Sequence, residues 1–120
     1  MHIRNAKAIQ GVESAHGEVV YELFGTAARE SHTHSLAQIV IPPGKASLKH
    51  YHPVAEESYM ILSGTGYMEM DGETVLLGPG DSVMIRPAQV HRIVNAGDAD
   101  LILLAVCVPA WRPENSVFLD

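Results

Sequence analysis

Short apolar runs separated by turn-forming residues make up the hydrophobic pattern of the chain. The runs have the length of strands, and none continues with the 3.6-residue period of an amphipathic helix. They predict strands at residues 19–24, 36–41, 48–52, 58–62, 66–70, 74–77, 82–85, 91–95 and 101–108. Many short, evenly spaced strands are typical of an all-β sandwich or barrel, which is the fold class we expect.

The sharpest turn signal is the pair Asp71-Gly72. A two-residue primed turn needs positive φ at both central positions, and Asp-Gly tolerates that conformation. Met70 and Glu73 should therefore flank a tight hairpin.

One predicted strand and the turn after it carry side chains that suit a metal ion. His50 and His52 are two residues apart, so a strand directs both to the same face. Pro53 has no amide hydrogen and ends the ladder, and a short turn can then bring Glu57 beside the two histidines. His91, from a distant strand, is a candidate fourth ligand. Three imidazoles and one carboxylate would hold one divalent metal ion.

At these residues the sequence resembles the cupin superfamily. The first cupin motif, G-x5-H-x-H-x4-E-x6-G, is matched in full by Gly44, His50, His52, Glu57 and Gly64. The second, G-x5-P-x-G-x2-H-x3-N, is matched at Gly80, His91 and Asn95, with Arg86 in place of proline and Ala88 in place of glycine. The resemblance covers residues 39–108.

The cupin resemblance implies a double-stranded β-helix, or jelly-roll barrel, with the metal held between the sheets near one open end. We expect a single cupin domain over residues 1–120. Residues 1–38 would form an N-terminal strand segment before the motif region, and residues 109–120 a C-terminal tail.

Strand parity extends the site beyond the metal ligands. If the ligands face inward, Tyr59, Ile61 and Ile93 face inward too. Tyr59 is the candidate catalytic residue because it has a polar tip, although a buried tyrosine bonded to backbone fits the pattern equally well. Gln38 and Met84 are candidate substrate-binding residues whose parity the sequence does not fix.

Arg86 is a third candidate for substrate binding. An inward guanidinium could hold a carboxylate or phosphate in bidentate fashion, and a surface arginine on a turn is the alternative. The resemblance also implies that oxalate-type decarboxylases carry an arginine just before the first motif histidine. Lys49 stands there and parity turns it away from the metal, so that reaction is less expected than generic metal chemistry.

Four protein ligands would leave two positions open on an octahedral ion. Mn²⁺ or Fe²⁺ is favoured because Glu57 supplies an anionic oxygen, with Zn²⁺ or Ni²⁺ as alternatives. We expect a metal-dependent enzyme acting on a small oxygen-bearing metabolite, as an oxygen-dependent oxidoreductase or as an isomerase or lyase by Lewis-acid catalysis. The alternative is a non-catalytic small-ligand or sugar-binding module with a docking or structural metal.

A second H-x-H pattern, His32 and His34, has no carboxylate at the cupin spacing and reads as an exposed polar loop. The alternative is a loop that folds over the barrel mouth, where Arg29 and Glu30 would be candidate substrate contacts. Cys107 lies in an apolar run and is expected to be a buried thiol.

Composition narrows the partners. Eight basic and fourteen acidic residues give a formal charge of −6, and no cluster of Lys or Arg is available to bind phosphates, so nucleic acid is not expected. No apolar run is long enough to span a bilayer, and the start of the chain lacks a signal-peptide core, which predicts a cytoplasmic protein without a membrane partner.

Association with a second copy is also predicted. The cupin resemblance implies dimers, and residues 19–24 and 101–108 are available as interface strands. We expect a homodimer. Trp111 lies in a proline-containing tail and is expected to anchor that tail against the barrel or the partner, with a lid over the site as the alternative.

Overall fold

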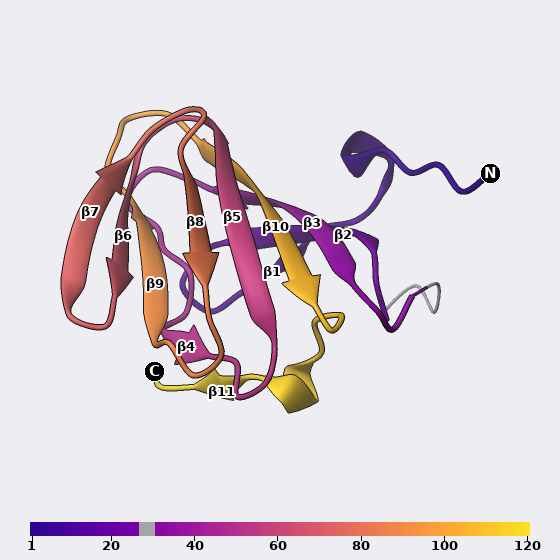
Figure 1. Ribbon diagram of the computed structural model, residues 1–120. Coiled ribbons are helices and arrows are strands. Elements are labelled where there is room, and N and C mark those ends of the chain that lie inside the picture. Colours follow the sequence, from indigo (N-terminus) through magenta and orange to yellow (C-terminus); the bar gives the residue numbers. More distant parts are fainter. Residues whose placement is uncertain (27–30) are drawn as a thin grey trace.

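The strands of the computed structural model, which describes residues 1–26 and 31–120, form two facing sheets (Figure 1). One sheet has the order β1 (Val12–Glu13), β2 (Val19–Phe24), β3 (Ser35–Ile41), β10 (Leu101–Val108), β5 (Glu56–Ser63), β8 (Ser82–Ile85). The other has the order β11 (Val117–Phe118), β4 (His50–Tyr51), β9 (His91–Asn95), β6 (Gly66–Met70), β7 (Glu73–Leu77). Two short 3-10 helices are η1 (Ala6–Ala8) and η2 (Pro113–Asn115).

All the predicted strands are present, with ends that differ by one or two residues. β1 and β11 were not predicted, because two-residue strands are too short to produce a hydrophobic period. The hairpin at Asp71-Gly72 is confirmed. Met70 pairs with Glu73, and Asp71 and Gly72 have φ values of 50° and 84°.

Alternating side chains from both sheets build the core between them. In β3 and β10 every second residue is buried, as a half-exposed strand requires. Ile61, Ile93 and Leu103 are at most 1% exposed. Each such side chain contributes about 1.5–3 kcal/mol of transfer free energy, so strand parity is fixed firmly. The inward positions predicted for Tyr59, Ile61 and Ile93 are confirmed.

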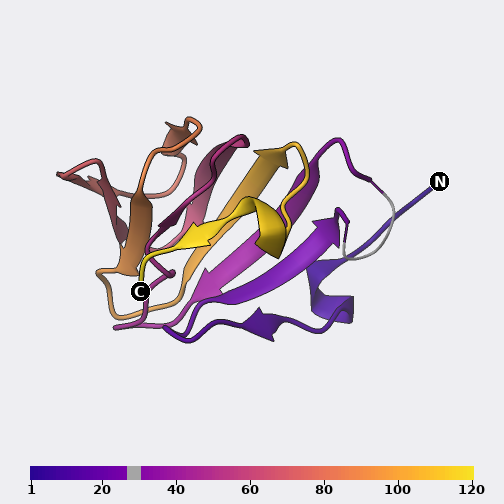
Figure 2. The same ribbon diagram turned by 90° about the horizontal axis from the view of Figure 1, so that it is seen from below.

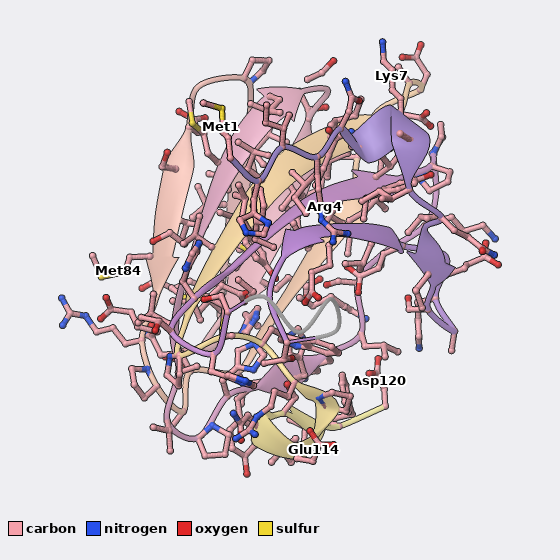
Figure 3. The ribbon with its side chains drawn as sticks, turned by 90° about the vertical axis from the view of Figure 1, so that its right-hand side faces the viewer. Met1, Arg4, Lys7, Met84, Glu114 and Asp120 are labelled. Atoms are coloured by element: carbon pink, nitrogen blue, oxygen red, sulfur yellow. The ribbon has the colours of Figure 1, made fainter. Side chains whose placement is uncertain are left out.

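Two predicted pocket residues lie on the opposite face. In β3 the buried neighbours are Ala37 and Ile39, so Gln38 is directed to the outer side of the sheet. In β8 the buried residue is Ile85, and Met84 is 50% exposed at the edge of the molecule (Figure 3). The prediction that Gln38 and Met84 line the pocket is therefore wrong, because the inward parity belongs to their neighbours.

The C-terminal tail crosses one end of the two sheets (Figure 2). β11 pairs with β4, which places Phe118 opposite His50. Beyond it, the amide of Leu119 donates to the carbonyl of Lys49 at 2.9 Å, and Asp120 Oδ1 accepts from the amide of Lys49 at 2.8 Å. The tail thus adds a strand beside the predicted metal ligands. Among the described residues, no helix has the length and apolar character needed to cross a membrane.

Candidate metal centre

The four predicted ligands come together between the two sheets. His50 and His91 are cross-strand neighbours in β4 and β9, Glu57 comes from β5 in the facing sheet, and His52 lies just after β4. One ligand atom from each lies within 4.8 Å of the others, and all four residues are buried. The spacing that suggested the cluster is therefore realised in the fold, at the end crossed by the tail.

Hydrogen bonds at Nδ1 set the imidazole rings for metal binding. His50 Nδ1 is 2.8 Å from the carbonyl of Leu48, and His91 Nδ1 is 3.0 Å from the carbonyl of Gln89. A carbonyl oxygen only accepts, so each Nδ1 carries the proton and the neutral ring presents a bare Nε2. A fixed tautomer with Nε2 free is the usual state of a metal-binding histidine.

The bare atoms face one another without partners. His52 Nε2 lies 3.3 Å and His91 Nε2 3.6 Å from Glu57 Oε1. All three atoms are buried and lack a hydrogen-bond partner among the described residues. Buried polar atoms are rarely left unpaired, because desolvation without a partner is costly. A divalent cation would satisfy all of them at once, so the residues present fit a metal ion.

The charge state of the cluster also suits a cation. Burial by itself raises the pKa of Glu57, but hydrogen bonding and charge from His52 and His91 outweigh burial and hold this pKa at about 2. Burial, reinforced by the neighbouring charge of His91, lowers the pKa of His50 to about 4. At neutral pH the cluster therefore offers an ionised carboxylate and a neutral His50 imidazole, both in the form that a metal requires.

The loop before His91 keeps its shape despite the departures from the second motif. Ala88 adopts a φ of 70°, the left-handed conformation natural to the glycine that it replaces. Its amide donates to the carbonyl of His52 at 2.8 Å and so joins this loop to the first motif. Asn95 is buried and donates to the carbonyls of Ile41 and Ala99, both at 2.8 Å, which gives it a structural role.

The sequence did not reveal that the tail helps to build the site. Ser116 Oγ lies 3.0 Å from His52 Nδ1 and 3.4 Å from the carbonyl of Arg112, to which it donates. It can then accept from His52, so that all three imidazoles are held through Nδ1. The Phe118 ring lies 5.6 Å from the His50 ring. No motif marks these contacts, because they join residues far apart in the chain.

A cavity of about 570 Å³ opens beside the cluster, within the range of small-molecule sites. Tyr59 lines this cavity, is 3% exposed, and lies 6.0 Å from His91 between ring centroids. Burial, then the nearby charges of Glu57 and Glu18, raise the pKa of Tyr59 well above its ordinary value. Tyr59 is therefore a neutral phenol in the pocket.

Trp111 also lines the cavity, and its backbone is anchored. Its amide donates to Ser35 Oγ at 2.9 Å, and its carbonyl accepts from Thr26 Oγ1 at 3.0 Å. The expected anchoring role is confirmed, and the same residue forms part of the cavity wall.

Two cavity residues, Glu18 and Glu22, were missed in the sequence. They share parity with Val20 along β2 and its first flanking residue, and all three line the cavity. Burial, followed by the charge of Glu57, raises the pKa of Glu18 to about 7. The available signal was the placement of two acidic residues at even spacing on an otherwise apolar strand.

Other predicted contacts do not reach the site. Arg86 is exposed and does not line the cavity, so the predicted substrate contact is wrong; the adjoining turn directs the side chain to solvent. His32 and His34 are exposed, as expected, and Arg29 and Glu30 lie outside the described residues. Cys107 is buried, and burial with the charge of Glu57 raises its pKa to about 12, so it stays a thiol.

Comparison with known proteins agrees with this architecture. Residues 37–107 match the family model described as a cupin domain, and the chain belongs to the cupin family. An uncharacterized protein of Methanocaldococcus jannaschii is 33% identical over 87% of this chain and 83% of its own length. An oxalate-binding protein of Thermotoga maritima is 31% identical over 83% of this chain and 84% of its own.

A glucose-6-phosphate isomerase of Pyrococcus furiosus is 32% identical over 73% of this chain and 54% of its own length, so this chain spans about half of that enzyme. Among solved structures, a double-stranded β-helix protein of Klebsiella pneumoniae has a TM-score of 0.80 at 19% identity, over 100% of this chain and 98% of its own. That likeness shows the fold. A predicted oxalate decarboxylase of Thermotoga maritima has a TM-score of 0.77 at 26% identity, over 89% of this chain and 98% of its own.

Proposed function

We propose that this cupin binds one divalent metal ion through His50, His52, Glu57 and His91 and uses it as an enzyme on a small oxygen-bearing metabolite. The observation that carries the proposal is the set of unpaired, buried atoms of His52, Glu57 and His91 beside a cavity of about 570 Å³. A structural metal alone would not need a cavity of this size next to it. Ligand and site therefore occupy the same end of the fold.

The ion would supply Lewis acidity or a redox centre to a bound oxygen atom. Imidazole nitrogen with one carboxylate suits Mn²⁺ or Fe²⁺ first, with Zn²⁺ or Ni²⁺ as alternatives. Isomerase or lyase chemistry is the favoured reaction class, because curated relatives include isomerases. Oxygen-dependent oxidation is the other class. The neutral phenol of Tyr59 would donate a hydrogen bond to the substrate.

A non-catalytic binding module is the second candidate, and one observation favours it. A relative of similar length is named as an oxalate-binding protein. In that case the metal would dock the ligand, and Tyr59 would fix its orientation without turnover.

The test begins with elemental analysis of the protein purified without added chelator. One equivalent of a transition metal per chain is expected. The loaded protein is then incubated with a panel of sugars, hydroxy acids, diketones and catechols while products and oxygen consumption are followed. Product formation without oxygen uptake supports an isomerase or lyase, and uptake supports an oxidase or dioxygenase. Binding without turnover across the panel supports the second candidate, and protein without metal contradicts both.

We also propose that the chain acts as one cupin unit that pairs with a second copy. The outer face of β5 and β10 exposes Met60, Leu62, Val106 and Val108, which are 39–50% exposed. Contiguous apolar side chains on an outer sheet face are typical of an interface. Light scattering at micromolar concentration should give twice the chain mass, and Val106→Glu should reduce it. A monomeric mass for the unmodified protein contradicts this proposal.

A further inference from the structure

The cavity beside the metal ligands is acidic and largely apolar. Among the described residues that line it are four carboxylates, from Glu13, Glu18, Glu22 and Glu57, and one guanidinium, from Arg4. If Glu57 binds the metal, three carboxylates still remain along the cavity. Lys49, which follows the strand parity predicted for it, is exposed and does not line the cavity.

Two of these carboxylates lie on the inner side of the sheet. Glu18 and Glu22 flank Val20 at two-residue spacing, and all three belong to the lining. The strands beside them add small apolar side chains at Ala37 and Ala105. Ionised carboxylates only accept hydrogen bonds, so they suit a ligand that brings donors such as hydroxyl groups.

The rest of the wall would receive an apolar frame. Its apolar members include Ile9, Val20, Ile39, Leu48, Trp111 and Phe118. Trp111 and Phe118 come from the tail, and Ile9 from the segment before β1. Figure 3 shows this N-terminal segment, with Arg4, running across the same open side of the molecule. A ligand here meets apolar surface on several sides and acceptors along β2.

The behaviour of Glu18 shows how this environment treats a negative charge. Burial, and then the charge of Glu57, raise its pKa to about 7. A carboxylate or phosphate on a ligand would meet the same desolvation and add to the same repulsion. An uncharged hydroxyl group would avoid both.

We propose that the ligand of this cavity is an uncharged molecule with adjacent hydroxyl groups on an apolar frame, selected by Glu18 and Glu22. These two side chains accept hydrogen bonds from the hydroxyls and repel anionic analogues. The inference rests on the proposed function, because the metal site is what places a reacting oxygen at this end of the cavity.

The test compares two probes that differ by one charge. Catechol is an uncharged diol on an aromatic ring, and 3,4-dihydroxybenzoate adds a single carboxylate to it. Isothermal titration of the Mn²⁺-loaded protein should show catechol binding tighter by about tenfold or more. Glu18→Gln and Glu22→Gln should each reduce that ratio to about threefold or less. Glu73→Gln, which makes the same change at an exposed position of β7, should leave the ratio unaltered.

Other outcomes overturn the inference. If 3,4-dihydroxybenzoate binds as tightly as catechol or tighter, the cavity selects an anion; loss of that preference in Arg4→Gln would identify the receiving group. Failure of both probes to bind the loaded protein also overturns it. Elemental analysis of the same samples separates the two levels. One metal per chain with the wrong preference overturns this inference alone, whereas absence of metal overturns the proposed function and this inference with it.

Discussion

Ser116 Oγ lies 3.0 Å from Nδ1 of His52, although 64 residues separate the two in the chain. The contact joins the C-terminal tail to a predicted metal ligand. Groups that hold the second nitrogen of a ligating histidine fix its tautomer and orientation, and their loss typically weakens metal binding by about 10–100-fold.

We therefore expect Ser116→Ala to weaken Mn²⁺ binding by about tenfold while the protein stays folded. The change removes the acceptor of the His52 Nδ1 proton and leaves the ligand set intact. A competitive titration with a fluorescent chelator measures the affinity. Ser82→Ala, at an exposed position of β8, is the matched control and should bind as the unmodified protein does. Equal affinity in Ser116→Ala would show that the tail does not orient His52.

The four ligands should differ in how much metal their variants retain. His50→Ala, His52→Ala and His91→Ala should each lose most of the bound metal after dialysis, because each removes a nitrogen from the buried cluster. Glu57→Gln should weaken binding less, since the amide keeps an oxygen but loses the charge. Elemental analysis is the measurement.

The exposed pair His32 and His34 supplies the control for these variants. Replacing both by alanine should leave the metal content unchanged, since neither belongs to the cluster. Metal lost from the double variant but retained in His91→Ala would mean that the ion is bound elsewhere.

Glu18 should make the metal-free protein less stable as pH rises. Its pKa is raised from 4.5 to about 7, so between these values the folded protein keeps a proton that the unfolded chain has released. Stability from this group is complete below pH 4.5 and is lost as pH rises through 7. Glu18→Gln does not ionise, so it should exceed the unmodified protein by about 3 kcal/mol more at pH 8 than at pH 4.

Urea unfolding of both metal-free proteins at pH 4 and pH 8 measures this difference. His50 titrates in both, so its contribution cancels from the comparison. Glu73→Gln, exposed on β7, is the control. A stability difference between Glu18→Gln and the unmodified protein that does not change with pH would contradict the prediction.

Ala88 should be a site where glycine improves stability. A residue with a Cβ atom is strained by about 1–2 kcal/mol in the left-handed conformation that Ala88 adopts at φ 70°. Part of that gain is offset by the greater freedom of glycine in the unfolded chain, so we expect Ala88→Gly to add about 0.5–1 kcal/mol. Thermal unfolding measures it. Ala96→Gly, whose φ is not positive, should instead destabilise, and equal effects at both positions would contradict the argument.

Local rules were sufficient for much of this fold. Strand lengths and turn residues predicted the strands, and Asp71-Gly72 predicted its hairpin, because these depend on neighbours in the chain. The fixed period of a strand also predicted that His50, Tyr59 and Ile93 share the interior once one residue in each strand was assigned to it.

Parity gave no answer where no ligand marked the inner face. In β3, Leu36 and Val40 on the outer side are as apolar as Ala37 and Ile39 on the inner side, so the sequence alone did not show where Gln38 points. Met84 lies in a strand of the same kind. Only the packing of one sheet against the other decides which side is buried.

The sequence by itself determined the fold family and the His50, His52, Glu57 and His91 cluster, because a strand and a turn convert fixed spacing into fixed direction. The tertiary structure alone decided that Ser116 supports His52 and that Glu18 and Glu22 share the cavity. Those contacts join segments far apart in the chain, and such contacts depend on how the sheets and the tail pack, which no local pattern records.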